Sequence, residues 1–115
     1  MRLVYIAGPY RGSDIQIRAN VTNAEMMAEV IIANAPNLLP IVPHSIGRRY
    51  EHIRPEHEYW LPATLVLMER CHAVYMLPGW QRSEGSKAER ARALEMGLPV
   101  FDNPDALFAW ARETP

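Results

Sequence analysis

The sequence predicts one α/β domain over residues 1–115, built on a parallel sheet, and three observations support this class. The chain has 115 residues, which is about the length of a single domain. Short apolar segments alternate along it with longer segments of helical periodicity. The apolar segments also lack the regular polar positions of a half-exposed strand, which indicates strands covered on both faces. We therefore expect a three-layer sandwich with a four- to five-stranded parallel sheet in the middle.

Four segments are predicted as strands. Residues 2–7 are rich in β-branched and aromatic side chains and stop at a Gly-Pro pair. Residues 37–42 contain Pro40, which has no backbone N–H to donate and therefore favours a strand at the edge of the sheet. The other two predicted strands are residues 73–77 and 98–101.

The longest predicted helix covers residues 15–33. Apolar residues recur there every three or four positions, and Ser13 or Asp14 can cap the first turn. We expect this apolar stripe to face the core. Its members are Ile15, Ala19, Val21, Ala24, Met27, Ala28 and Ile31.

Three further helices are predicted. One covers residues 61–71, with Pro62 in the first turn, where the missing N–H is tolerated. Another covers residues 85–96, and the last begins with Asn103 as its cap and Pro104 as its first residue. Residues 43–60 have no clear period, and a loop of this length is usually functional or contains a short helix. We expect a substrate lid in that segment.

Charge and composition exclude several classes of protein. The net charge is -1 and there is no long basic run, so a nucleic-acid polymer is not expected as a partner. No apolar segment is long enough for a membrane span or a signal-peptide core, so we expect a soluble, cytoplasmic protein without a membrane partner. The single cysteine, Cys71, is expected to be a small buried thiol.

Metal and cofactor sites are also not expected. The four histidines show neither close pairing nor Cys clustering, so no metal site is predicted. The sequence has neither the G-x-G-x-x-G pattern of dinucleotide-binding proteins nor the Walker lysine motif. No cofactor is therefore predicted.

Three loops are candidates for a ligand site, because ligands of open parallel sheets bind beyond the carboxyl ends of the strands. In the first loop, Gly8 and Gly12 allow close approach of the backbone, Tyr10 can stack or donate a hydrogen bond, and Arg11 can bind an anion. An ordinary tight turn is the alternative. In the second loop, His44 is either a ligand contact or, as is more usual for a loop histidine, a solvated side chain or local hydrogen-bond partner.

The third loop leads into the helix predicted at residues 85–96. Ser83, Gly85 and Ser86 precede or open this helix, whose amino end favours negative charge. Glu89 follows Ser86 at the S-x-x-E spacing of a capping box, and a carboxylate near a helix start is also stabilised as the anion that a nucleophile requires. Both roles for Glu89 remain open at this level.

Larger portions of the sequence are similar to a known family. They are "VYIAGPYRG" at the first strand, "VPHS" at the second and "CHAVYMLPGWQRSEGSKAERARALEMGLPV" at the third. The chain resembles the nucleoside 2-deoxyribosyltransferase-like superfamily, particularly its small bacterial and phage members, from Val4 to Phe101. The most specific likeness is the S-x-G-x-x-x-E pattern, met by Ser83, Gly85 and Glu89. The resemblance implies a Rossmann-like or flavodoxin-like fold.

The resemblance also implies an activity. In that superfamily the glutamate attacks C1′ of a deoxyribonucleoside or its 5′-monophosphate, and water or a second base then takes the sugar, which agrees with retaining glycoside chemistry. By this likeness Glu89 is the nucleophile, and Tyr10 with the Gly8–Gly12 turn lines the ligand. Ser83, Gly85 and Ser86 would contact sugar or phosphate. A neighbouring chain often completes the pocket, so a homo-oligomer is expected.

The chain departs from this family at two positions. Relatives usually carry aspartates where Thr64 and His72 stand here, and we considered Asp14, Glu56 and Glu58 as replacements. Arg11, Arg48 and Arg49 make a 5′-phosphate reasonable, although solvation at the surface explains each arginine alone. Two hypotheses follow: an enzyme that cleaves or transfers an N-glycosidic bond, and a non-catalytic nucleotide-binding or sensing module on the same fold.

Overall fold

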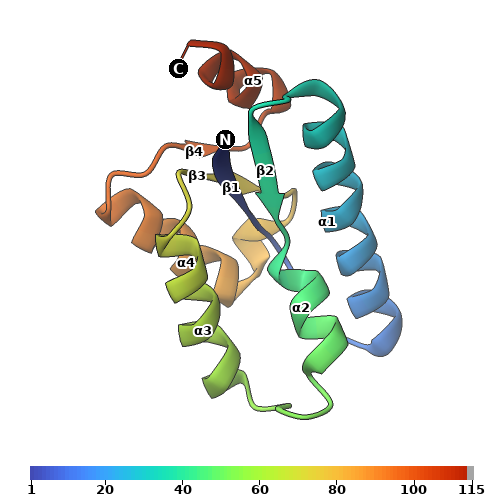
Figure 1. Ribbon diagram of the computed structural model, residues 1–115. Coiled ribbons are helices and arrows are strands. Elements are labelled where there is room, and N and C mark those ends of the chain that lie inside the picture. Colours follow the sequence, from blue (N-terminus) through green and yellow to red (C-terminus); the bar gives the residue numbers. More distant parts are fainter. Residues whose placement is uncertain (114–115) are drawn as a thin grey trace.

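The computed structural model describes residues 1–113 and is an α/β protein with a four-stranded, all-parallel sheet (Figure 1). The strand order is β2-β1-β3-β4, which is the flavodoxin-like order for the strands present. The predicted fold class is therefore confirmed. The strands are β1 (Arg2–Ala7), β2 (Leu38–Ile41), β3 (Ala73–Met76) and β4 (Val100–Phe101).

Helices cover both faces of this sheet. Alternate residues of β1 point to opposite faces, so Val4 and Ile6 pack with α1 and α5, whereas Tyr5 and Ala7 pack with α3 and α4. The short helix α2 follows β2 and lies beside α1 (Figure 1). The helices are α1 (Asp14–Asn34), α2 (Pro43–Tyr50), α3 (His57–Glu69), α4 (Glu84–Glu95) and α5 (Pro104–Glu113).

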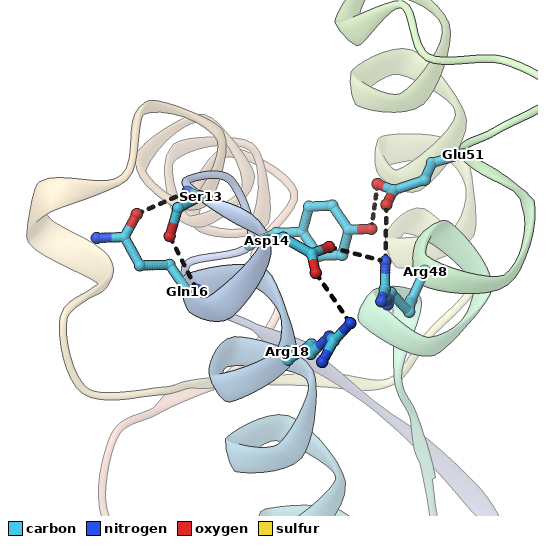
Figure 2. Close-up of polar contacts among 7 residues, drawn as sticks. Ser13, Asp14, Gln16, Arg18, Arg48 and Glu51 are labelled. Carbon is cyan, nitrogen blue, oxygen red and sulfur yellow. Dashed lines mark hydrogen bonds and ion pairs between the residues drawn. The ribbon is translucent and has the colours of Figure 1, made fainter.

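Ser13 caps α1. Its hydroxyl accepts a hydrogen bond from the N–H of Gln16, and the Gln16 side chain accepts one from the N–H of Ser13 (Figure 2). The apolar stripe is buried or half-buried from Val21 onward, but the prediction is wrong for Ile15, which is 79% exposed, and for Ala19, which is also exposed. The first turn of α1, which contains Ile15, extends past the carboxyl end of the sheet (Figure 1).

The other elements follow the predictions closely, except around α3. β2 lies at the edge of the sheet, as Pro40 indicates, and the Asn103 side chain caps α5 by accepting from the N–H of Ala106. α3 begins at His57, earlier than predicted, so Pro62 lies in its second turn rather than its first. Residues 43–60 contain α2 and the start of α3 instead of one long loop. Within residues 1–113, every helix is too short or too polar to cross a bilayer.

Candidate functional site

A cavity of about 380 Å³ lies at the carboxyl end of the sheet, where the loops after β1, β2 and β3 meet. This is the edge at which parallel sheets bind ligands. All predicted site residues except Gly12 line the cavity. These lining residues are Gly8, Tyr10, Arg11, His44, Ser83, Gly85, Ser86 and Glu89.

Gly12 lies outside the lining of the cavity. Its φ is +152°, and a Cβ atom at this position would lie 2.4 Å from the amide oxygen of the Gln16 side chain. Gln16 is the residue that completes the cap of α1. Gly12 therefore provides room for the start of a helix.

Glu89 is not a helix cap. The residue that caps α4 is Ser83, whose hydroxyl accepts from the N–H of Ser86 at 3.2 Å. Because α4 begins at Glu84, Glu89 lies in its second turn, and the capping-box interpretation of Ser86 and Glu89 is wrong. The Glu89 side chain is instead directed to the sheet and is only 7% exposed.

Two hydroxyl groups act on the Glu89 carboxyl group. The Tyr5 hydroxyl donates a hydrogen bond to it from β1, and the Thr64 hydroxyl lies close enough on α3 to do so as well. Burial raises the pKa of Glu89 to about 7, while the hydrogen bonds from Tyr5 and Thr64 act in the opposite direction. Burial and the nearby Glu89 charge also raise the pKa of Tyr5, so this phenol stays a donor. The cavity thus contains a carboxyl group that titrates near neutral pH.

Thr64 and His72, the two departures from the family pattern, lie in different places. Thr64 lines the cavity, and its single hydroxyl proton has a second acceptor in the carbonyl of Leu61, 3.2 Å away. His72 lies just before β3, at the amino end of the sheet, where its Nδ1 accepts from the N–H of Leu3 at 2.9 Å. The neighbouring Cys71 is a buried thiol whose pKa burial raises to about 11, as an inert thiol requires.

The start of α4 forms one wall of the cavity. Ser86 is 1% exposed, and its Oγ has no hydrogen-bond partner among the described residues. A Cβ atom at Gly85 would meet no atom within 4 Å, so the backbone is open at this point. Arg82 and Arg11 also line the cavity. Open backbone and a helix amino end together favour an anionic or strongly polar ligand group here.

His44 is buried in the wall between the first two loops. It is 4% exposed, and its Nε2 lies 3.1 Å from the carbonyl oxygen of Gly8. Burial lowers the pKa of His44, so the ring is neutral and Nε2–H is the donor to that carbonyl. His44 therefore holds the loop after β1 through this hydrogen bond.

The acidic residues near the cavity differ from those considered in the sequence. Asp14, Glu56 and Glu58 do not line it, whereas Glu51, directly after α2, and Glu84, the first residue of α4, do. The Tyr10 hydroxyl donates to Glu51 at 2.5 Å. Sequence reasoning missed Glu51 because it lies in a segment without periodicity, and its position depends on where α2 ends.

Arg48 and Arg49 lie outside the cavity. Arg48 is between two carboxylates, 3.4 Å from Glu51 and 3.5 Å from Asp14, and Asp14 also pairs with Arg18 (Figure 2). Both arginines line a separate surface recess. Of the three arginines considered for a phosphate, only Arg11 lines the cavity, and its Nε donates to His57 at 2.9 Å.

The geometry defines a class of protein: a parallel α/β fold with a ligand-sized cavity at the carboxyl end of the sheet and a buried, hydrogen-bonded carboxyl group in its wall. The chain belongs to the family described as Domain of unknown function (DUF7768), whose model matches residues 2–103. Searches of curated proteins and of solved structures found no match. Within residues 1–113 no group of three or more His, Cys, Asp or Glu side chains is arranged to hold a metal ion.

Proposed function

We propose that the protein cleaves or transfers the N-glycosidic bond of a deoxyribonucleoside or its 5′-monophosphate, with Glu89 as the nucleophile. The observation that supports this most directly is the Glu89 carboxyl group, which lies in the cavity wall, makes no helix cap and accepts a hydrogen bond from Tyr5. Buried carboxyl groups with a perturbed pKa in a cavity are typical of active sites. The resemblance to the deoxyribosyltransferase-like superfamily points to the same residue.

The proposed reaction has two steps and uses only groups of this chain, substrate and water. The ionised Glu89 carboxylate forms a bond to C1′ as the C1′–N bond breaks, and the electron pair leaves with the base, which takes a proton from solvent or a cavity acid. Water or a second base then attacks C1′ and releases the carboxylate. The hydrogen bond from Tyr5 fixes the orientation of the carboxylate before attack.

The start of α4 supports a polar or phosphorylated sugar at its end of the cavity. Ser83, Gly85 and Ser86 offer backbone and hydroxyl groups there, and Arg82 adds a positive charge. The volume of about 380 Å³ lies in the range of small-molecule sites. By the same resemblance we expect a homo-oligomer. The sequence features described above lead us to expect a cytoplasmic protein that needs no cofactor.

Base release tests the proposal. The protein is incubated with each deoxynucleoside and each 5′-monophosphate, and free base is measured by chromatography. We expect release by the natural protein, and at least a roughly hundredfold lower rate for Glu89→Gln with its circular dichroism unchanged. Glu58→Gln, which alters an exposed carboxylate outside the cavity, should keep the full rate. A slow 2′-fluoro substrate analogue should add one glycosyl group to the peptide containing Glu89.

Two outcomes would contradict the assignment. Base release that survives Glu89→Ala would exclude Glu89 as the nucleophile. Binding of nucleotides without any release of base would instead support a non-catalytic nucleotide-binding or sensing module.

A further inference from the structure

Three glutamates line the cavity: Glu51, Glu84 and Glu89. Glu84 is 91% exposed and paired with Lys87, so Glu51 is the second carboxylate that the cavity partly encloses. Glu89 comes from α4 and Glu51 from the end of α2, and these helices lie on opposite sides of the carboxyl end of the sheet (Figure 1). The side chain of Glu51 is 28% exposed, whereas Glu89 is 7% exposed. A ligand that extends across the cavity from Glu89 can therefore contact Glu51.

The Glu51 carboxylate is fixed in orientation and keeps free acceptor positions. The Tyr10 hydroxyl donates to Oε2 at 2.5 Å, and Arg48, itself paired with Asp14, lies 3.4 Å from Oε1 (Figure 2). A carboxylate has about four acceptor positions. Contacts with Tyr10 and Arg48 occupy one on each oxygen, so each oxygen can accept another hydrogen bond from a ligand.

Electrostatics determines which part of a nucleotide can approach this carboxylate. A phosphate is repelled by Glu51, whereas the amino end of α4 and Arg82 favour it across the cavity. Glu84 begins α4, but its carboxylate is 91% exposed and paired with Lys87, so solvent and this ion pair weaken its repulsion. A keto oxygen is also repelled, whereas an N–H group donates favourably to a carboxylate. The base, presenting an N–H edge, is the part of the ligand that fits beside Glu51.

We propose that Glu51 determines specificity by selecting bases with an exocyclic amino group. Guanine fits best, because its N1–H and its amino group point along one edge and match two carboxylate oxygens. Tyr10 acts as a positioning residue, since it holds the carboxylate in place. This inference rests on the proposed function, because it needs a nucleoside or nucleotide in the cavity.

Matched ligand pairs test it by equilibrium binding. Deoxyguanosine is compared with deoxyinosine, and deoxycytidine with deoxyuridine, by titration calorimetry on the Glu89→Gln variant, which is expected to leave the ligands intact. We expect roughly tenfold or greater tighter binding of each amino ligand. Glu51→Gln added to this variant should remove the preference, and Tyr10→Phe should reduce it. Glu58→Gln is the matched control and should retain it.

The outcomes separate this inference from the proposed function. Equal binding within each pair, or a preference that persists in Glu51→Gln, would overturn the role of Glu51 while leaving the base-release assay unaffected. A fifth ligand, 2′,3′-dideoxyguanosine, identifies the donor. If the effect of Glu51→Gln depends on the 3′-hydroxyl and not on the amino group, Glu51 binds the sugar and the base assignment is wrong. If no deoxynucleoside or monophosphate binds, the proposed function fails as well.

Discussion

At the level of single residues, Glu89 shows two opposing physical effects. Burial disfavours its charged form, and the hydroxyl groups of Tyr5 and Thr64 favour it. The sum holds its pKa near 7, above the ordinary value of 4.5. A carboxyl group in this state is partly ionised at neutral pH, as the proposed nucleophile must be, and its burial lowers folding stability where it is ionised.

The raised pKa of Glu89 predicts how the free energy of unfolding depends on pH. A raised pKa in the folded protein means that stability is full below about pH 4.5 and falls as the pH rises to about 7, because only the unfolded chain ionises readily over that range. The full difference corresponds to roughly 3 kcal/mol. Glu89→Gln removes the titrating group, so it should gain stability relative to the natural protein between pH 4 and pH 8. Urea unfolding at both pH values measures this, and a constant difference between the two proteins would contradict it.

The place of Glu89 in the cavity wall could be predicted, but its surroundings could not. Its place after the third strand follows from the loop pattern. The S-x-x-E spacing indicated Ser86 as the cap, whereas Ser83 takes this position, because the number of residues that the chain uses to leave β3 decides where α4 begins. Tyr5 was missed because its inward direction depends on the face of β1 that it occupies, and Glu51 because nothing periodic marks its position.

At the level of elements, α4 does not begin where the S-x-x-E spacing of Ser86 and Glu89 predicts. Ser83 takes the capping position because a short 3₁₀ turn, Trp80–Arg82, precedes it and ends there. Ser86 is thereby placed inside the first turn, where its N–H donates to Ser83. The two residues of this capping hydrogen bond, Ser83 and Ser86, therefore also form part of the cavity wall.

A pair of serine substitutions tests this cap. Ser83→Ala removes the acceptor for the N–H of Ser86 and should lower the free energy of unfolding by about 1 kcal/mol. Ser86→Ala removes a hydroxyl without a partner among the described residues and should change stability much less. Urea unfolding of both variants measures the difference. A larger loss for Ser86→Ala would restore Ser86 as the capping residue.

The presence of a helix or strand could be predicted from the sequence better than its first and last residues. The strands and the longest helix follow from apolar runs and periodicity, because these patterns reflect burial directly. The start of α3 was missed because residues 57–60 are mostly exposed and so lack an apolar stripe. Pro62 suggested a first turn, although an exposed position further along a helix also accepts it at some cost.

At the level of the whole molecule, alternation of strands and helices predicted the class but not the order of the strands. In the order β2-β1-β3 the carboxyl ends of these three strands are neighbours, so the loops that follow them together line the cavity. Each helix covers the sheet only with the side chains of the stripe that faces it. Along α1 this stripe excludes the first turn.

Two isoleucines on α1 test this view of the core. Ile31 is fully buried, so Ile31→Ala should lower the free energy of unfolding by about 2–5 kcal/mol. Ile15 is 79% exposed, so Ile15→Ala should change it by less than about 0.5 kcal/mol. Both variants are compared by urea unfolding. A similar loss at both positions would mean that the first turn of α1 packs against the core after all.

Two adjacent residues in the loop after β1 donate side-chain hydrogen bonds to two different helical regions. Tyr10 donates to Glu51 at the end of α2, and Arg11 donates to His57 at the start of α3. Neighbouring side chains on an extended backbone point in different directions. Both contacts therefore require Tyr10 and Arg11 in this order, each on its own side of the loop. An insertion or deletion of a single amino acid between Gly8 and Tyr10 would exchange the directions of both side chains. In this loop the number of residues is therefore as restrictive as their chemistry.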